Sequence, residues 1–244
     1  MAYVLRHWYR QVPIVTRCYL AATLLTTTAC HLEIVTPLTL YLHPKLVFGE
    51  LQLWRLVTNC LYLGNPDFRL FLRLYGIVEC CKMLEEKSFR GRSADFFYMM
   101  LFGVMVLTGI VLGGRIVPSV SASFAGIYYL SDSLVIMMVY LWSKYNPSIP
   151  IGFILFTCTS AYLPWVLLGI SIFVGASPLV ELLGIVAGHA YYFLEDIYPR
   201  MTGRRPLKTP AFIKAWFADD EFMRPATHVR LAPPAPQDEL IRDE

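Results

Sequence analysis

Apolar residues run along this chain in long blocks rather than in the short alternation typical of a half-buried strand. A helix that crosses a bilayer needs about 20 mostly apolar residues, and six stretches approach or exceed that length. These predicted spans are Val15–Val35, Phe68–Leu84, Phe96–Leu112, Val120–Trp142, Ile151–Val174 and Leu179–Tyr198. Pro164 falls inside the fifth span and is expected to bend it. The pattern predicts an all-α polytopic membrane protein.

The composition favours a membrane protein over a soluble enzyme. Hydrophobic residues make up 56% of the 244 residues and charged residues 16%, against about 25% charged residues in soluble domains. The net charge of +3 is small and no basic tract is present, so nucleic acid is not expected as a partner. The six cysteines form no Cys-x-x-Cys pair, so we predict no metal site, no cofactor and no disulfide framework.

The positions of lysine and arginine predict how the six spans are oriented. With the N-terminus in the cytosol, sixteen of the 21 basic residues fall on the cytosolic side. Only Lys45, Arg55 and Arg115 fall on the opposite side, and Arg69 and Arg73 lie within the second span. Because cytosolic loops carry the excess of basic residues, we expect both termini in the cytosol.

The largest loop on the non-cytosolic side, Thr36–Asp67, contains a segment expected to lie in the membrane interface. Residues Glu50–Gly64 look amphipathic. Trp54 is expected at headgroup depth, while the guanidinium of Arg55 is expected to stay in water. We expect this pair to fix the loop in the lumenal leaflet, where it perturbs the membrane and admits substrate; the alternative is a simple interfacial anchor.

The C-terminal region divides into an interfacial helix and a tail. Lys208–Phe217 is predicted to form a short helix with Thr209 as its cap and Pro210 in its first turn. Its aromatic side chains, Phe212, Trp216 and Phe217, are expected to lie on the cytosolic face of the bilayer. Residues 218–244 are predicted to form a disordered cytosolic tail.

A packing signal lies in the sixth span. Gly184 and Gly188 are four residues apart, so they share one face of a helix and let a neighbouring backbone approach closely. His189 follows directly in apolar sequence. We expect this histidine to form a hydrogen bond to a neighbouring helix.

Several segments together resemble the derlins, which are inactive members of the rhomboid superfamily in the endoplasmic reticulum membrane. The resemblance rests on the Trp54-Arg55 pair, on KMLEEKSFRGRSADF at Lys82–Phe96, on YLPWVLLG at Tyr162–Gly169, on GIVAGHAYYFLEDIYP at Gly184–Pro199 and on LKTP at Leu207–Pro210. It implies that residues 1–217 form a six-span rhomboid-like helical bundle in that membrane, followed by the tail.

The resemblance also implies a non-catalytic function in endoplasmic-reticulum-associated degradation. Misfolded proteins would be retrotranslocated from the lumen or membrane to the cytosol through a lateral gate in a locally thinned bilayer. The implied partners are membrane lipids, misfolded substrates, a membrane ubiquitin ligase complex and an AAA ATPase. Some derlins bind the ATPase through a tail motif, Phe-x-Gly-x-Gly-Gln-x-Leu, which does not follow Phe217 here. We therefore expect the ATPase to be recruited indirectly.

The catalytic positions of rhomboid proteases are replaced in this sequence. Those enzymes place a serine in span four and a histidine base in span six, and these positions hold Ser131 and Glu181 here. The oxyanion positions of span two hold Arg69 and Arg73, and His189 lies eight residues beyond the base position. Serine is a weak nucleophile without an adjacent base. We therefore predict that the protein is not an enzyme.

The same region is expected to form a polar cavity open to the lumen. Isolated charges in hydrocarbon are costly, so Arg69, Arg73, Asp132 and Glu181 should pair or face water, beside Ser131. Alternatively, the two arginines extend to the headgroups while Glu181 sits in the lumenal interface. Two other functions stay open, namely an active intramembrane serine protease that uses Ser131 and a small-solute transporter, since ionisable groups in spans often mark polar pathways.

Overall fold

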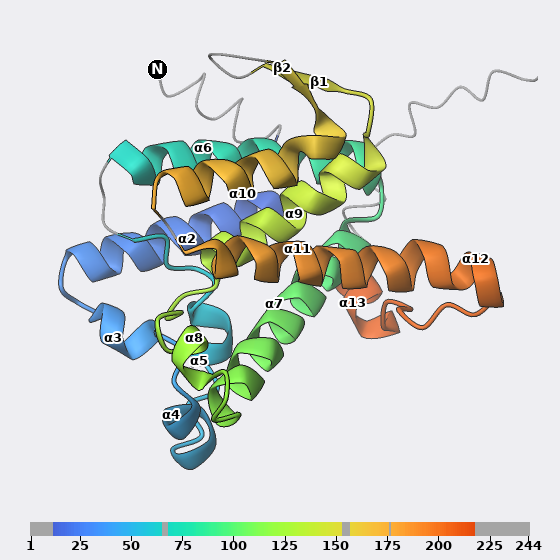
Figure 1. Ribbon diagram of the computed structural model, residues 1–244. Helices are drawn as coiled ribbons and strands as arrows, with labels where there is room; N and C mark the ends of the chain where they lie inside the picture. Colours follow the sequence, from blue (N-terminus) through green and yellow to red (C-terminus); the bar gives the residue numbers. More distant parts are fainter. Residues whose placement is uncertain (1–11, 65–67, 153–156, 176, 218–244) are drawn as a thin grey trace, which may run out of the picture.

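The computed structural model describes residues 12–64, 68–152, 157–175 and 177–217, and this part of the chain is mostly helical (Figure 1). The long helices are α2 (Ile14–His31), α6 (Phe68–Met83), α7 (Ser93–Ile116), α9 (Ser131–Tyr145), α10 (Leu163–Phe173) and α11 (Pro178–Tyr192). The predicted tail at 218–244 lies outside the described residues.

Short elements connect the long helices. The connection between α2 and α6, called the first loop, holds α3 (Pro37–Leu40), α4 (Pro44–Gly49) and α5 (Arg55–Thr58). The others are a π-helical turn η1 (Leu84–Ser88), α8 (Ser121–Ala125), the strands β1 (Pro150–Gly152) and β2 (Thr157–Thr159), a 3-10 turn η2 (Ser160–Tyr162), a second π-helical turn η3 (Phe193–Ile197), α12 (Tyr198–Thr202) and α13 (Ala211–Trp216).

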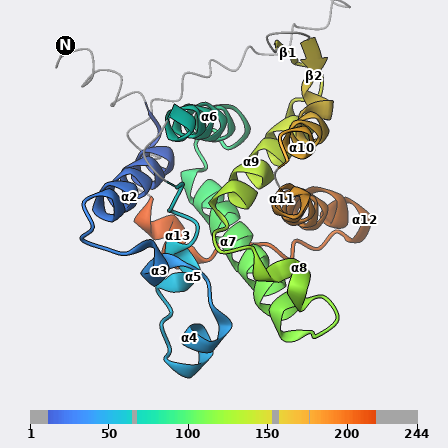
Figure 2. The same ribbon diagram turned by 60° about the vertical axis from the view of Figure 1, so that its left-hand side comes forward.

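Helix α9 runs through the middle of the bundle, and Figure 2 shows α6, α7, α10 and α11 arranged around it. Its apolar side chains Leu134, Met137 and Leu141 are fully buried. Because residues three and four apart share a helix face, this spacing directs one continuous stripe of α9 into the core.

One helix in the described part of the chain, α7, is both long and apolar enough to cross a membrane by itself. It has 24 residues, which corresponds to about 36 Å at 1.5 Å per residue. Helices α9 and α10 have 15 and 11 residues, or about 22 and 16 Å. Helix α7 is therefore about twice as long as α10, which packs on the other side of α9 in the same bundle.

The predicted fourth span, Val120–Trp142, is wrong in its first half. Helix α9 begins only at Ser131, and the segment before it holds the short helix α8 followed by residues 127–130, which have no regular secondary structure. The backbone N–H of Leu130 donates to the carbonyl of Asn59, and Leu42 donates likewise to Tyr128. Apolar residues of this segment are thus buried against the first loop. Their hydrophobicity is satisfied by this burial and does not require a helix.

The predicted fifth span, Ile151–Val174, is also wrong in its first half. Strands β1 and β2 pair antiparallel there, with Ile151 opposite Cys158. Helix α10 begins at Leu163, so Pro164 lies in its first turn and does not bend a longer helix. Proline suits this position because the first turn of a helix leaves its N–H groups without partners in any case.

The start of α2 is held by a carboxylate from another helix. Glu85 in η1 is fully buried and accepts hydrogen bonds from the backbone N–H groups of Val15 and Thr16 and from the Thr16 hydroxyl, at 3.3, 3.0 and 2.7 Å. A negative charge is favourable at a helix N-terminus, where free N–H groups point outward. This contact ties α2 to the end of α6.

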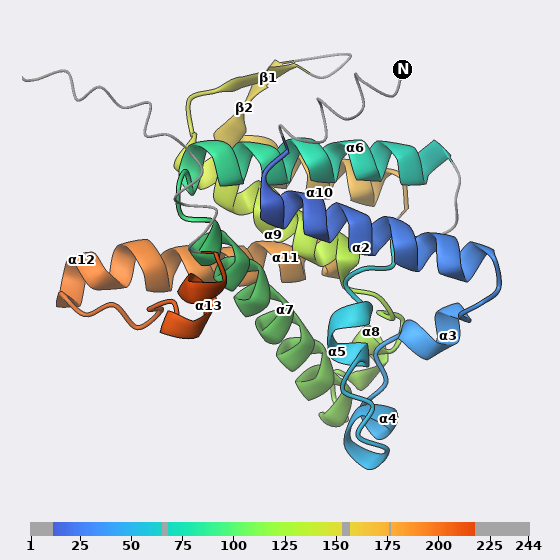
Figure 3. The same ribbon diagram turned by 180° about the vertical axis from the view of Figure 1, so that it is seen from behind.

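The C-terminal helix α13 lies against α7, as Figure 3 shows. The predicted cap is wrong, because the Thr209 hydroxyl donates to Asp95 Oδ1 of α7 at 2.6 Å instead of capping α13. Phe212 and Trp216 are exposed, whereas the ring of Phe217 packs on Phe97, 5.7 Å between centroids. Phe217 therefore docks the helix on the bundle.

Candidate functional site

Helices α6, α9 and α11 bring most of the sequence-predicted polar residues to one end of the bundle. Arg73 comes from the first half of α6, and Ser131 and Asp132 open α9. Glu181 lies in the first turn of α11. Arg69 also lies in α6, but its side chain is outside the described part of the structure.

Arg73 joins three parts of the chain. Its Nη2 lies 3.2 Å from Asp132 Oδ2, and its Nη1 donates to the carbonyl of Leu63 at 2.7 Å. The pair links α6 to α9, and the second contact secures the end of the first loop. Both charged side chains are close to half exposed, so they reach solvent or headgroups while remaining paired.

Ser131 is buried, and its hydroxyl donates to the carbonyl of Tyr62 at 2.7 Å. Ser133, two residues further along α9, donates to the carbonyl of Val180 at 2.7 Å. In both cases a serine hydroxyl donates a hydrogen bond to a backbone carbonyl of another segment, the first loop for Ser131 and the first turn of α11 for Ser133. These contacts place Ser131 in the packing between α9 and the first loop.

Glu181 pairs with a hydroxyl rather than with an arginine. Its Oε1 accepts a hydrogen bond from Ser171 of α10, and its Oε2 is buried without a hydrogen-bond partner in the described structure. Among the described members of the expected cluster, Arg73 pairs with Asp132, and Glu181 bonds elsewhere. One ion pair lies between α6 and α9, and one carboxylate lies between α10 and α11.

The glycines of α11 pack on α9. A methyl group added to Gly184 would lie 2.4 Å from the backbone oxygen of Ser133, and one on Gly188 would lie 2.8 Å from the ring of Tyr140. Real contacts of a side-chain β-carbon are longer than either distance, so both positions favour glycine at the observed helix separation. The other side chain of this group, His189, shares a hydrogen bond between Nδ1 and the Tyr140 hydroxyl at 2.8 Å.

Trp54 and Arg55 have different surroundings. Trp54 is 57% exposed, but Arg55 is only 5% exposed, so the expectation that its guanidinium stays in water is wrong. Arg55 donates from Nη1 to the carbonyls of Leu38 and Tyr41, at 2.9 and 3.0 Å. Arg55 thus holds the first loop together from inside, and of the two residues only Trp54 is exposed.

The sequence alone indicates only the charge of Arg115, yet this residue joins the first loop to the connection between α7 and α9. It lies in the last turn of α7 and donates to the carbonyls of Leu42, Phe124 and Ile127. A single arginine at the C-terminal end of a long apolar helix was the available signal, because a cation is favourable where helix carbonyls are free.

No group of three His, Cys, Asp or Glu side chains placed to bind a metal ion is found in the described structure. The six cysteines, all of which are described, are free thiols.

Comparison with known proteins supplies the remaining information. The model of the Der1-like family matches residues 12–211. The chain is 61% identical to Derlin-2.2 of Zea mays over 221 residues, which cover 90% of this chain and 89% of the relative. It is 57% identical over the full length of both chains to Derlin-2.2 of Arabidopsis thaliana, and 37% identical to Derlin-1 of the same plant, over 92% of this chain and 82% of the relative.

Proposed function

The chain belongs to the Der1-like family, and from this premise we propose that it helps misfolded proteins leave the endoplasmic reticulum for degradation. Substrates from the lumen or membrane pass to the cytosol beside the bundle, through a lateral gate and a locally thinned bilayer, without being cleaved. Both termini lie in the cytosol in this proposal. The family membership supports the derlin-like role, and helix lengths and side-chain contacts support the mechanism.

The difference in helix length carries the proposal for a thinned bilayer. Helix α7, at about 36 Å, is long enough for a hydrocarbon core of about 30 Å, whereas the apolar helical stretch formed by η2 and α10, Ser160–Phe173, measures about 22 Å. Ile172, Phe173 and Val174 at the end of α10 are exposed, Phe173 by 92%. A short apolar helix is accommodated by local thinning of the lipid, which lowers the barrier to a polar segment.

Lengthening α10 tests this mechanism. Inserting four apolar residues after Gly169, about one turn or 6 Å, should slow the degradation of a misfolded lumenal protein, because the bilayer needs to thin less beside α10. The measurement is substrate half-life in cells that lack their own derlins and express the variant at the wild-type level. The same four residues inserted after Gly203, in an exposed turn, form the matched control. Wild-type half-life with the lengthened α10 would contradict the mechanism.

The contacts of Ser131 support a function without hydrolysis. Its hydroxyl is engaged by the carbonyl of Tyr62, and Glu181 is bonded to Ser171. Nucleophilic catalysis needs a base within hydrogen-bond reach of the serine. We expect Ser131→Ala to support substrate degradation at the wild-type rate and a serine-reactive phosphonate to leave the chain unlabelled. Labelling that disappears in Ser131→Ala would instead favour the protease.

The proposed partners are a membrane ubiquitin ligase complex and, through it, an AAA ATPase. Affinity purification from gently solubilised membranes should recover both. If recruitment is indirect, a chain without residues 218–244 should recover the ATPase as efficiently as the full chain. Loss of the ATPase with retention of the ligase would show that the tail binds it directly.

A further inference from the structure

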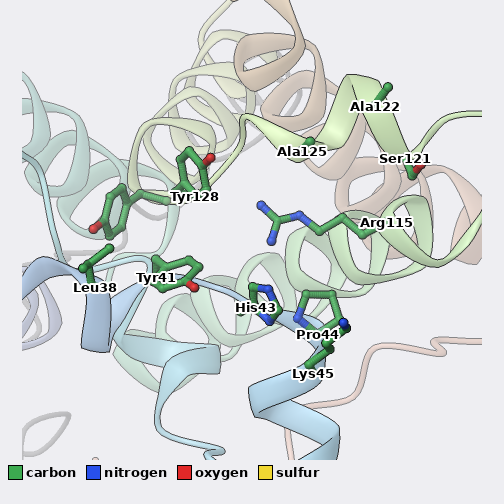
Figure 4. A pocket seen from close by; sticks show the side chains of 11 residues that line it. Leu38, Tyr41, His43, Pro44, Lys45, Arg115, Ser121, Ala122, Ala125 and Tyr128 are labelled. Atoms are coloured by element: carbon green, nitrogen blue, oxygen red, sulfur yellow. The ribbon is translucent and has the colours of Figure 1, made fainter.

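A pocket of about 810 Å³ lies between the first loop and the connection from α7 to α9. Figure 4 shows the guanidinium of Arg115 pointing into the space between Tyr128 on one side and Tyr41 and His43 on the other. Lys45 lines the same pocket from the first turn of α4. The volume falls within the range of about 300–1,000 Å³ that is usual for small-ligand sites.

The pocket is positively charged. Arg115 and Lys45 line it, and none of the described residues in its lining is acidic. Arg115 is held in place by three carbonyls, including Leu42 O at 2.6 Å, and its charge lies 5.9 Å from the ring centre of Tyr128. A guanidinium bound by neutral carbonyls keeps its full positive charge, so the site attracts an anion without needing to rearrange.

His43 supplies a second observation that points to a ligand. Its Nδ1 is buried and has no hydrogen-bond partner in the described structure. A buried polar nitrogen without a partner is costly, and such atoms are usually satisfied by protein, water or a ligand. In the Nδ1-protonated tautomer this nitrogen donates a hydrogen bond, which suits an oxyanion bound beside Arg115 and Lys45.

The surface around the pocket indicates where the anion comes from. Phe48 is exposed three residues after Lys45 in α4, and Ile116 is exposed directly after Arg115. Leu38, in the pocket wall, is also exposed. Cations bordered by exposed apolar side chains are typical of a surface that lies at the depth of lipid headgroups.

We propose that this pocket binds the phosphate of an anionic phospholipid in the leaflet next to the first loop. Arg115 and Lys45 contact the phosphate, and His43 donates to one of its oxygens. The acyl chains extend past Phe48 and Leu38 into the bilayer. A bound lipid would hold the first loop at a fixed depth, and this binding does not depend on substrate transport.

Titration of the purified full-length chain with short-chain lipids tests the proposal. In detergent, native mass spectrometry should show one dihexanoyl phosphatidic acid bound per chain, about tenfold more tightly than dihexanoyl phosphatidylcholine, because the latter carries a compensating cation. Lys45→Glu should weaken phosphatidic acid binding at least about tenfold, the equivalent of one charge-assisted hydrogen bond. His43→Phe should weaken it by a smaller factor while keeping the ring volume.

The matched control is Lys87→Glu, which reverses an exposed lysine outside the pocket and should bind as the wild type does. Equal affinity for the two lipids, or wild-type binding by Lys45→Glu, would overturn the site. Inorganic phosphate that binds as tightly as phosphatidic acid would overturn the assignment to lipid. A hexaglutamate peptide that binds more tightly than the lipid would assign the pocket to acidic polypeptide instead.

Discussion

The guanidinium of Arg73 lies 3.2 Å from the carboxylate of Asp132, and it also donates a hydrogen bond to the carbonyl of Leu63. One arginine thus connects α6, α9 and the end of the first loop. The two charged side chains are 45% and 41% exposed, so solvent screens their attraction.

Removing the charge of Arg73 should have a small effect on stability. We expect Arg73→Met to lower the free energy of unfolding by about 1 kcal/mol, mainly through the lost hydrogen bond to Leu63. A double-mutant cycle with Asp132→Asn should give a coupling of about 1 kcal/mol or less, measured by thermal unfolding in detergent. Arg90→Met, at an exposed position outside this site, is the control. A coupling of several kcal/mol would show that the pair is shielded from solvent.

The packing of α11 on α9 predicts that even alanine is too large at Gly184. The added methyl group would meet the backbone oxygen of Ser133 at 2.4 Å, and a backbone atom cannot rotate away. Gly184→Ala should therefore destabilise the protein by about 1–3 kcal/mol. Gly169→Ala in α10 is the matched control, because nothing lies within 4 Å of its added carbon. There, alanine should stabilise by up to about 1 kcal/mol, and destabilisation of similar size in both variants would contradict the packing explanation.

Alanine substitutions at Trp54 and Arg55 should affect stability differently, although the two residues are adjacent. Arg55→Ala leaves the carbonyls of Leu38 and Tyr41 without their donor, and we expect it to lower stability by about 1.5–3 kcal/mol. Trp54→Ala removes an exposed ring and should change stability by less than about 0.5 kcal/mol. If Trp54 anchors the loop in the lipid, this variant should still slow substrate degradation at equal protein level. A large loss of stability in Trp54→Ala would show that the ring packs on protein.

Glu85 is expected to be among the most sensitive positions of the bundle. Its carboxylate is 0% exposed and satisfies three donors at the start of α2. Glu85→Ala leaves those donors buried, and we expect a loss of about 2–4 kcal/mol together with faster proteolysis of α2. Glu86→Ala, at the next and partly exposed residue, should have little effect on either measurement. Similar losses at the two positions would indicate a general weakening of η1 instead.

The blocks of apolar residues determined by themselves that the chain is helical, and they located α2, α6, α7 and α11 well. The four-residue spacing of Gly184 and Gly188 likewise identified a helix-packing face, because that spacing depends only on the geometry of one helix. Sequence similarity also identified the family, because the segments that resemble derlins are spread over most of the chain.

Only the tertiary structure decided where α9 and α10 begin. Hydropathy reports that a side chain prefers to leave water, and the protein interior satisfies this preference as well as lipid does. Ile127 and Leu130 are buried, and the backbone of Leu130 bonds to Asn59 of the first loop, so this apolar segment is irregular rather than helical. The partners of Arg55, Arg115 and Glu85 were decided in the same way. Each partner lies on another segment, and the sequence of one segment does not state which distant carbonyl or N–H will lie beside it.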